Sequence, residues 1–136
     1  MNRNLIWSES DCVLQKKDFE LIEKDKGVLF PSDFKEKIGP INGSRLRLGY
    51  FSHHELGDIS YMGNISLSEK SKFNVWEINS WSIKDQNLIP FGDDGNGDYI
   101  CLNLKDGHIY FWNHETDDVS FICDNFSEFF EMLRCD

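Results

Sequence analysis

The residues best suited to bind a cation lie in an acidic, glycine-rich loop in the C-terminal half of the chain. Asp94, Asn96 and Asp98 fit the first, third and fifth positions of an EF-hand calcium loop. However, the sixth position, where the sharp turn needs glycine, is Tyr99, and the twelfth, where a bidentate glutamate is needed, is Lys105. The spacing therefore predicts a β-turn loop that holds no metal.

The histidines offer a second set of candidate ligands and bases. His54-Glu55 begins the H-E-x-x-H pattern of zinc sites, but the fifth position is Asp58 and no helix is predicted there. His108 and His114 flank a predicted strand with aromatic neighbours, where single histidines are more often structural. The chain also has no Gly-x-Ser-x-Gly nucleophile elbow and no cysteine beside a histidine. We therefore expect neither an enzyme nor a bound cofactor.

The four cysteines contain no C-x-x-C pair. Cys101 and Cys123 fall inside predicted strands, where a thiol packs as a small apolar group. We expect reduced, buried cysteines rather than a disulfide framework or a zinc site.

The charge of the chain is concentrated in its C-terminal third. Residues 93–136 hold 2 basic and 11 acidic side chains, which gives −9 of the total net charge of −10. Such a field repels nucleic acid and anionic membranes, and it attracts basic protein surfaces. The sequence leaves open the alternative that these acidic turns only keep the protein soluble.

The elements that must position these groups follow from periodicity. Apolar runs predict strands over residues 99–104, 108–113 and 119–123, with a hairpin turn at Asp106-Gly107 between the first two. The period then changes, and a helix over residues 126–134 is predicted by four apolar side chains on one face: Phe126, Phe129, Phe130 and Leu133. A three-stranded ribbon cannot bury its own face, so this helix is expected to cover it.

The middle strand suggests a binding surface. Ile109 and Phe111 share the natural core side, while His108, Tyr110 and Trp112 share the other. One arrangement leaves Tyr110 and Trp112 exposed beside carboxylates, as anchors of a protein interface. The other arrangement covers both faces of the sheet with helices and buries all four aromatic side chains of the strand. The candidate partner-binding residues are Asp93, Asp94, Asp98, Tyr110, Trp112, Glu115, Asp117 and Asp118.

The N-terminal half is predicted to contain a helix from about Asp18 to Gly27 and another that begins at Pro31 and stops at Gly39-Pro40. Alternation over residues 45–50 predicts a half-buried strand. Residues 66–81 carry mixed signals, which we interpret as a helix.

With 136 residues, 40% of them hydrophobic, we expect one domain over residues 1–136. The chain has no apolar run of ~20 residues and its N-terminus turns acidic, which predicts a cytoplasmic protein.

Several of these segments resemble the motifs of a known family in the same order. Its N-terminal pattern is matched by Glu23, Phe30-Pro31-x-x-Phe34-x-x-Lys37-Ile38 and Asn42-Gly43-Ser44. Its central and C-terminal patterns are matched by Leu88-Ile89-Pro90-Phe91-Gly92-Asp93-Asp94, Gly97-Asp98-Tyr99-Ile100-Cys101-Leu102, Ile109-Tyr110-Phe111-Trp112-Asn113-His114-Glu115 and Asn125-Phe126-Ser127-Glu128-Phe129-Phe130. Over roughly residues 15–134 the chain resembles the SUKH superfamily of Smi/Knr-type domains. The N-terminal match departs from the family pattern at Phe30, Lys37 and Ser44.

The resemblance implies an α+β fold, a mostly antiparallel sheet with helices packed on it. It also implies a non-enzymatic immunity protein that binds a cognate polymorphic or contact-dependent toxin and neutralises it by occlusion. The acidic C-terminal third fits a toxin with a basic surface, such as a nuclease, because an acidic inhibitor can mimic nucleic acid. The alternative is a regulatory or scaffolding module with no toxin partner, as in the fungal branch of the superfamily.

Overall fold

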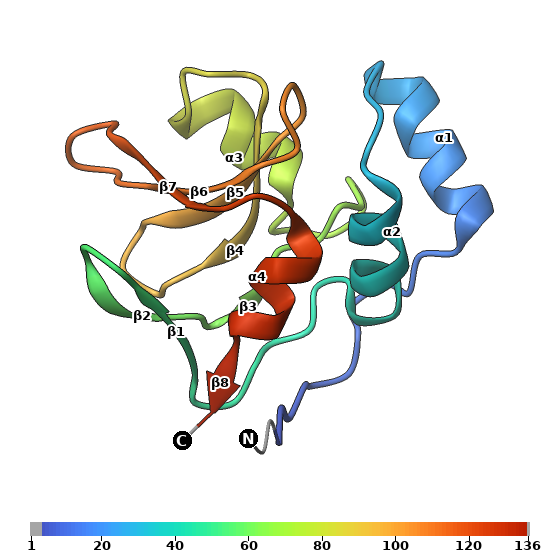
Figure 1. The fold of residues 1–136 in the computed structure, drawn as a ribbon. Coiled ribbons are helices and arrows are strands. Elements are labelled where there is room, and N and C mark those ends of the chain that lie inside the picture. The colour runs from blue at the N-terminus through green and yellow to red at the C-terminus, as the bar shows by residue number, and fades with distance from the viewer. Residues whose placement is uncertain (1–3, 136) are drawn as a thin grey trace.

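The computed structural model describes residues 4–135. Within them the helices are α1 (Lys16–Lys26), α2 (Ser32–Ile38), the short 3-10 helix η1 (Gly39–Ile41), α3 (Val75–Ser82) and α4 (Phe126–Met132). The strands are β1 (Gly49–His53), β2 (Gly57–Ser60), β3 (Gly63–Asn64), β4 (Leu88–Asp93), β5 (Tyr99–Asn103), β6 (Ile109–Trp112), β7 (Val119–Cys123) and β8 (Arg134–Cys135). These strands form a five-stranded sheet in the order β3-β4-β5-β6-β7 and a three-stranded sheet in the order β2-β1-β8, and neighbouring strands are antiparallel (Figure 1). The expected α+β fold is therefore confirmed.

The predicted C-terminal meander is confirmed as β5, β6 and β7, followed by α4. In the register, Tyr99 lies opposite Trp112 and Cys101 lies opposite Tyr110. Gly107 has a φ of 77° in the turn between β5 and β6, a conformation that favours glycine. The structure adds β4 to this meander, a strand that the sequence patterns did not predict. The predicted helix over 126–134 ends at Met132, because the chain then pairs with β1 as β8.

The predicted strand over residues 45–50 is wrong for residues 45–48, and only Gly49 and Tyr50 lie in a strand. Leu48 has a positive φ of 51° and its side chain is 63% exposed, so the chain turns there and β1 begins only at Gly49. A Cβ on Gly49 would clash with the Leu46 side chain, because the chain folds back closely on itself here. Leu46 instead makes an isolated bridge with Trp7 near the N-terminus. The alternation of Leu46, Leu48 and Tyr50 was therefore a coincidence of spacing across a turn.

The two N-terminal helices are confirmed with small shifts. Asp18 accepts a hydrogen bond from the backbone N–H of Gln15, so α1 starts two residues before Asp18. Gly27 ends α1 in the left-handed conformation, with a φ of 66°. Phe34 and Ile38 on α2 are fully buried, as their spacing predicted. The helix predicted over residues 66–81 is present only from Val75 onward, because the preceding segment bends and the Asn74 side chain caps α3 through Trp76 N and Glu77 N.

The core joins the two sheets through α4. Figure 1 shows α3 on one side of the five-stranded sheet, with α4 and the β1–β2 hairpin on the other side. The ring of Phe129 makes edge contacts with Phe51 of β1 (5.1 Å between centroids), Tyr61 (5.4 Å) and Phe91 of β4 (5.5 Å). Phe129 therefore contacts both sheets at once.

A second link between the sheets is polar. His53 of β1 is buried, and its Nδ1 accepts hydrogen bonds from the backbone N–H groups of Glu55 and Leu56. The proton of the neutral ring must then sit on Nε2, which donates to the carbonyl oxygen of Phe121 on β7 (2.8 Å). His53 thus fixes the β1–β2 hairpin against the outer strand of the larger sheet.

Within residues 4–135 no helix is long and apolar enough to cross a membrane.

Candidate acidic interface

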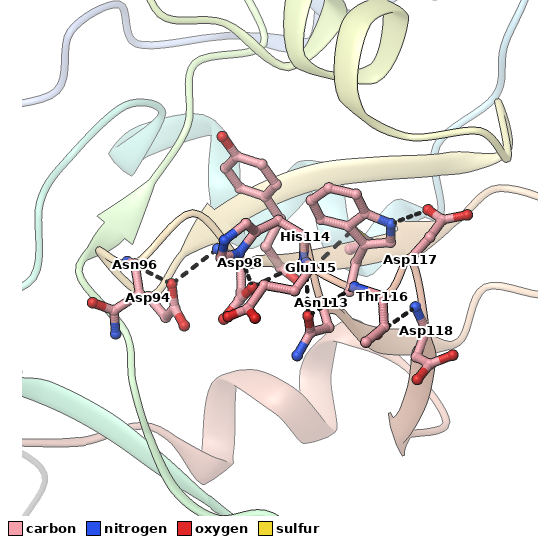
Figure 2. Close-up of polar contacts among 12 residues, drawn as sticks. Asp94, Asn96, Asp98, Asn113, His114, Glu115, Thr116, Asp117 and Asp118 are labelled. Atoms are coloured by element: carbon pink, nitrogen blue, oxygen red, sulfur yellow. Dashed lines mark hydrogen bonds and ion pairs between the residues drawn. The ribbon is translucent and has the colours of Figure 1, made fainter.

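Two acidic segments meet at one end of the five-stranded sheet. One is the loop between β4 and β5, and the other is the turn between β6 and β7 (Figure 2). The Asp98 carboxylate joins them, because its Oδ1 accepts from the backbone N–H of His114 (2.9 Å) and pairs with His114 Nδ1 (2.6 Å). Segments that lie some 16 residues apart thus form a single acidic surface.

Hydrogen bonding explains the protonation of this pair. The Asp98 hydrogen bond raises the pKa of His114 above its ordinary value of 6.5. Burial acts to raise the pKa of Asp98, but the hydrogen bonds from His114 outweigh it, and this pKa falls below the ordinary value of 3.8. Both shifts favour an ion pair between a carboxylate and an imidazolium.

Asp94 and Asp93 are held inside the structure. Asp94 is 7% exposed, and its Oδ1 accepts from the backbone N–H groups of Asn96 (2.8 Å) and Asp98 (3.2 Å). Burial raises the pKa of Asp94, with a further contribution from Asp98. Asp93 forms an ion pair with Arg45 (2.8 Å). These two carboxylates therefore shape the loop more than they display charge.

The turn between β6 and β7 presents charge more openly. Glu115 and Asp118 are exposed at its surface. Asp117 has a positive φ of 63°, and its Oδ1 accepts a hydrogen bond from Trp112 Nε1 (2.6 Å). Lys84 reaches the other oxygen of Asp117 at 4.0 Å. Of the six predicted carboxylates, Glu115 and Asp118 are the ones best placed to meet a partner.

The two predicted aromatic anchors differ in exposure. Trp112 is only 3% exposed, and its ring stacks on Tyr99 with 5.7 Å between centroids. Of the two arrangements that the sequence left open, the one with both Tyr110 and Trp112 facing solvent does not hold for Trp112, since the Tyr99 ring and the Asp117 carboxylate contact it. Tyr110 is half-buried and donates its hydroxyl proton to Asp106 Oδ2 (2.7 Å). This hydrogen bond raises the pKa of Tyr110 to about 12, so the phenol stays protonated at neutral pH.

Sequence reasoning placed His108 on the same side of the strand as Tyr110, but it missed two other residues that gather there, Asp106 and Phe121. Phe121 lies opposite Tyr110 in the register of β6 and β7, and it is 43% exposed. The signal in the sequence was the alternation of Val119 and Phe121 around Ser120, which marks one face of a strand. Only the register of the sheet places that face beside Tyr110.

The candidate metal ligands are engaged in other bonds. Asp94 closes its loop through backbone amides, His54 Nε2 contacts Glu55 Oε1 (3.2 Å), and Asp58 Oδ1 accepts a hydrogen bond from the Ser52 hydroxyl. The described part of the chain, residues 4–135, contains no group of three or more His, Cys, Asp or Glu side chains that could hold a metal ion.

Cys101 and Cys123 are buried as predicted, whereas Cys12 is exposed and Cys135 is half-buried. All four are free thiols outside any disulfide.

We predict that the protein folds without divalent cations, because backbone amides already hold the acidic loop in place. Adding calcium or zinc to chelator-treated protein is expected to leave the melting temperature unchanged, as measured by differential scanning fluorimetry. A rise of several degrees at low micromolar metal would contradict this prediction.

The fold and this surface define an α+β domain with a mostly antiparallel sheet that carries a concentrated acidic surface at one end. The chain belongs to the SMI1 / KNR4 family (SUKH-1), whose sequence model matches residues 14–132. A search of curated proteins finds no significant match. Family membership agrees with the resemblance in the sequence motifs, which covers nearly the same residues.

Proposed function

We propose that this protein is a cytoplasmic immunity protein, which binds a cognate polymorphic or contact-dependent toxin domain and neutralises it by occlusion. Membership of the SMI1 / KNR4 family (SUKH-1) carries this proposal, because the superfamily includes many immunity proteins of that kind. In this role the chain is a binder and not an enzyme. The toxin carries a basic surface, as a nuclease does.

The joined acidic loops support the proposed charge of the partner. They hold Glu115 and Asp118 at the surface, beside a carboxylate network fixed by His114. A fixed acidic surface raises the rate of encounter with a basic protein, and an acidic inhibitor can occupy the cleft that would bind nucleic acid. The same field disfavours nucleic acid and anionic membranes as partners of this chain.

The test requires the toxin encoded beside the gene for this protein. We expect the double variant Glu115→Gln/Asp118→Asn to associate with that toxin roughly two- to tenfold more slowly than wild type. Its dissociation rate should change little, since rim charges act mainly on encounter. Raising the salt concentration should slow wild-type association, because the Debye length shortens to about 8 Å at physiological ionic strength. Stopped-flow or surface plasmon resonance measures all three quantities.

The matched control is Glu20→Gln/Glu36→Gln, which removes the same charge from exposed positions on α1 and α2. It should associate at a rate close to that of wild type. Equal slowing by both double variants would mean that only net charge matters and that the acidic loops are not the encounter surface. If the neighbouring toxin neither binds the protein nor is neutralised by it in co-expression, the immunity function is wrong and a regulatory or scaffolding module becomes the better description.

A further inference from the structure

Three rings on the outer face of β6 and β7 form one cluster, away from the acidic loops. The Phe121 ring makes edge contacts with His108 (5.4 Å between centroids) and with Tyr110 (6.0 Å). His108 and Tyr110 also stack, with 6.4 Å between their centroids. This cluster lies on the opposite side of β6 from the core residues Ile109 and Phe111.

Asp106 fixes the arrangement of this aromatic cluster. Its Oδ1 accepts from the backbone N–H of His108 (2.8 Å), and its Oδ2 accepts from the Tyr110 hydroxyl (2.7 Å). Burial acts to raise the pKa of Asp106, but these hydrogen bonds prevail and lower it below the ordinary value. The carboxylate is therefore charged at neutral pH and held beside the rings.

The cluster is open to solvent. Phe121 is 43% exposed and Val119, two residues before it on β7, is 45% exposed. Elsewhere in the described residues the chain places its own cations over aromatic rings, with Lys26 Nζ 5.2 Å from the Trp76 centroid and Lys37 Nζ 5.6 Å from the Phe130 centroid. Both distances lie within the ~6 Å range of a cation–π contact.

We propose that His108, Tyr110 and Phe121, with the Asp106 carboxylate, form a binding site for an arginine or lysine side chain of a protein partner. Aromatic faces attract cations through their quadrupoles, and an adjacent carboxylate supplies an opposite charge and a hydrogen-bond acceptor. The charge of −9 over residues 93–136 further favours a cationic occupant. The site deepens the proposed function, on which it rests, by identifying what the basic partner inserts.

Other occupants fit these residues less well. An apolar side chain docked on the cluster would remove water from the charged Asp106 without replacing its hydrogen bonds, which is unfavourable. A phosphate or carboxylate group would be repelled by Asp106 and by the acidic surface at the other end of β6. A cationic side chain is the occupant that satisfies both the rings and the carboxylate.

The site can be tested without the toxin, using two small probes in NMR titrations of the isolated protein. Nα-acetyl-arginine amide carries the guanidinium group, and Nα-acetyl-citrulline amide is its neutral counterpart of nearly equal shape. We expect the arginine probe to shift the ring signals of His108, Tyr110 and Phe121, and the citrulline probe to shift them much less. Equal shifts with both probes would overturn the proposal, because the site would then be merely apolar or polar.

Two variants test the assigned residues. Phe121→Ala removes an exposed ring, and Asp106→Asn keeps the size and the backbone hydrogen bond of the turn while removing its charge. Each is expected to weaken binding of the arginine probe by about two- to fivefold, the range for a cation–π contact at an exposed site. Phe73→Ala removes another exposed phenylalanine that is far from the cluster in sequence, so it should leave binding of the arginine probe unchanged. Unchanged binding by both Phe121→Ala and Asp106→Asn would overturn the site.

The same variants separate this inference from the immunity function. With the neighbouring toxin, Phe121→Ala should speed dissociation, whereas Glu115→Gln/Asp118→Asn slows association. If the toxin fails to bind but the arginine probe still selects the cluster, the immunity function is wrong and the site stands. If the toxin binds and Phe121→Ala leaves its dissociation rate unchanged, the immunity function stands and the cluster is not the insertion site.

Discussion

Replacing Phe129 by alanine is expected to lower the free energy of unfolding by about 3–5 kcal/mol, the range for a large aromatic side chain removed from a close-packed core. Phe129 is 0% exposed and contacts Phe51, Tyr61 and Phe91. Its loss leaves a cavity at the point where α4 joins the two sheets, and rigid strands on either side limit how far the cavity can collapse.

Urea unfolding followed by circular dichroism measures this change as a lower midpoint at similar slope. The matched control is Phe73→Ala, since the Phe73 ring is 50% exposed and lies outside the core. That substitution should change the free energy by roughly 0.5 kcal/mol or less. Similar losses for the two variants would mean that Phe129 is not the link between the sheets.

Replacing Trp112 by alanine is expected to lower the free energy of unfolding by about 3 kcal/mol or more. The indole ring is buried against Tyr99, and its Nε1 donates to Asp117 Oδ1. Alanine removes the ring and also leaves the Asp117 carboxylate without the indole N–H as a donor. Asp117 has a positive φ of 63°, so this hydrogen bond helps to hold an unfavourable backbone conformation. The turn between β6 and β7 should loosen as a result.

Trp112→Phe separates packing from hydrogen bonding. Phenylalanine keeps an aromatic ring for Tyr99 but has no N–H, so we expect a loss of about 1–2 kcal/mol. Thermal or urea unfolding of both variants provides the measurement. If Trp112→Ala leaves stability unchanged and only speeds dissociation from the toxin, Trp112 is an exposed interface anchor after all and the burial described above is wrong for the protein in solution.

The C-terminal half of the fold could be predicted from the sequence because its signals are local. The turn at Asp106-Gly107 joins strands adjacent in sequence, and the apolar residues Phe126, Phe129 and Phe130 of α4, with Leu133 just after it, repeat over about two helical turns. The hairpin strands find their partners within a few residues, and the helical period of the last segment is read within that segment alone. Local propensity and tertiary packing therefore indicate the same structure.

The second sheet could not be predicted because distant segments complete it. β8 follows α4 at the end of the chain and pairs with β1 at Gly49 and Tyr50. Leu46 pairs with Trp7 instead of continuing a strand. Alternation alone does not reveal that Leu48 turns the chain, since apolar residues spaced two apart also occur on either side of a turn.

The candidate site was predicted in composition but not in geometry. The sequence identified the acidic loops correctly as a concentration of charge, yet it treated all six carboxylates alike. The structure separates Asp94, which binds backbone amides, from the exposed Glu115 and Asp118. Sequence also could not place Phe121 beside Tyr110, because that contact depends on the register of two strands and on a bulge near Ile109.

The hydrogen bond from His53 has a consequence for how copies of the protein behave toward one another. β7 is the outer strand of the five-stranded sheet, and unpaired backbone groups on such a strand attract the strands of other molecules. His53 already occupies the carbonyl oxygen of Phe121 in the middle of β7. Asp117 and Asp118 precede the strand and Asp124 follows it, so like charges flank both of its ends. A neighbouring copy therefore meets a blocked acceptor between two repulsive ends, which protects this edge against intermolecular strand pairing at high protein concentration.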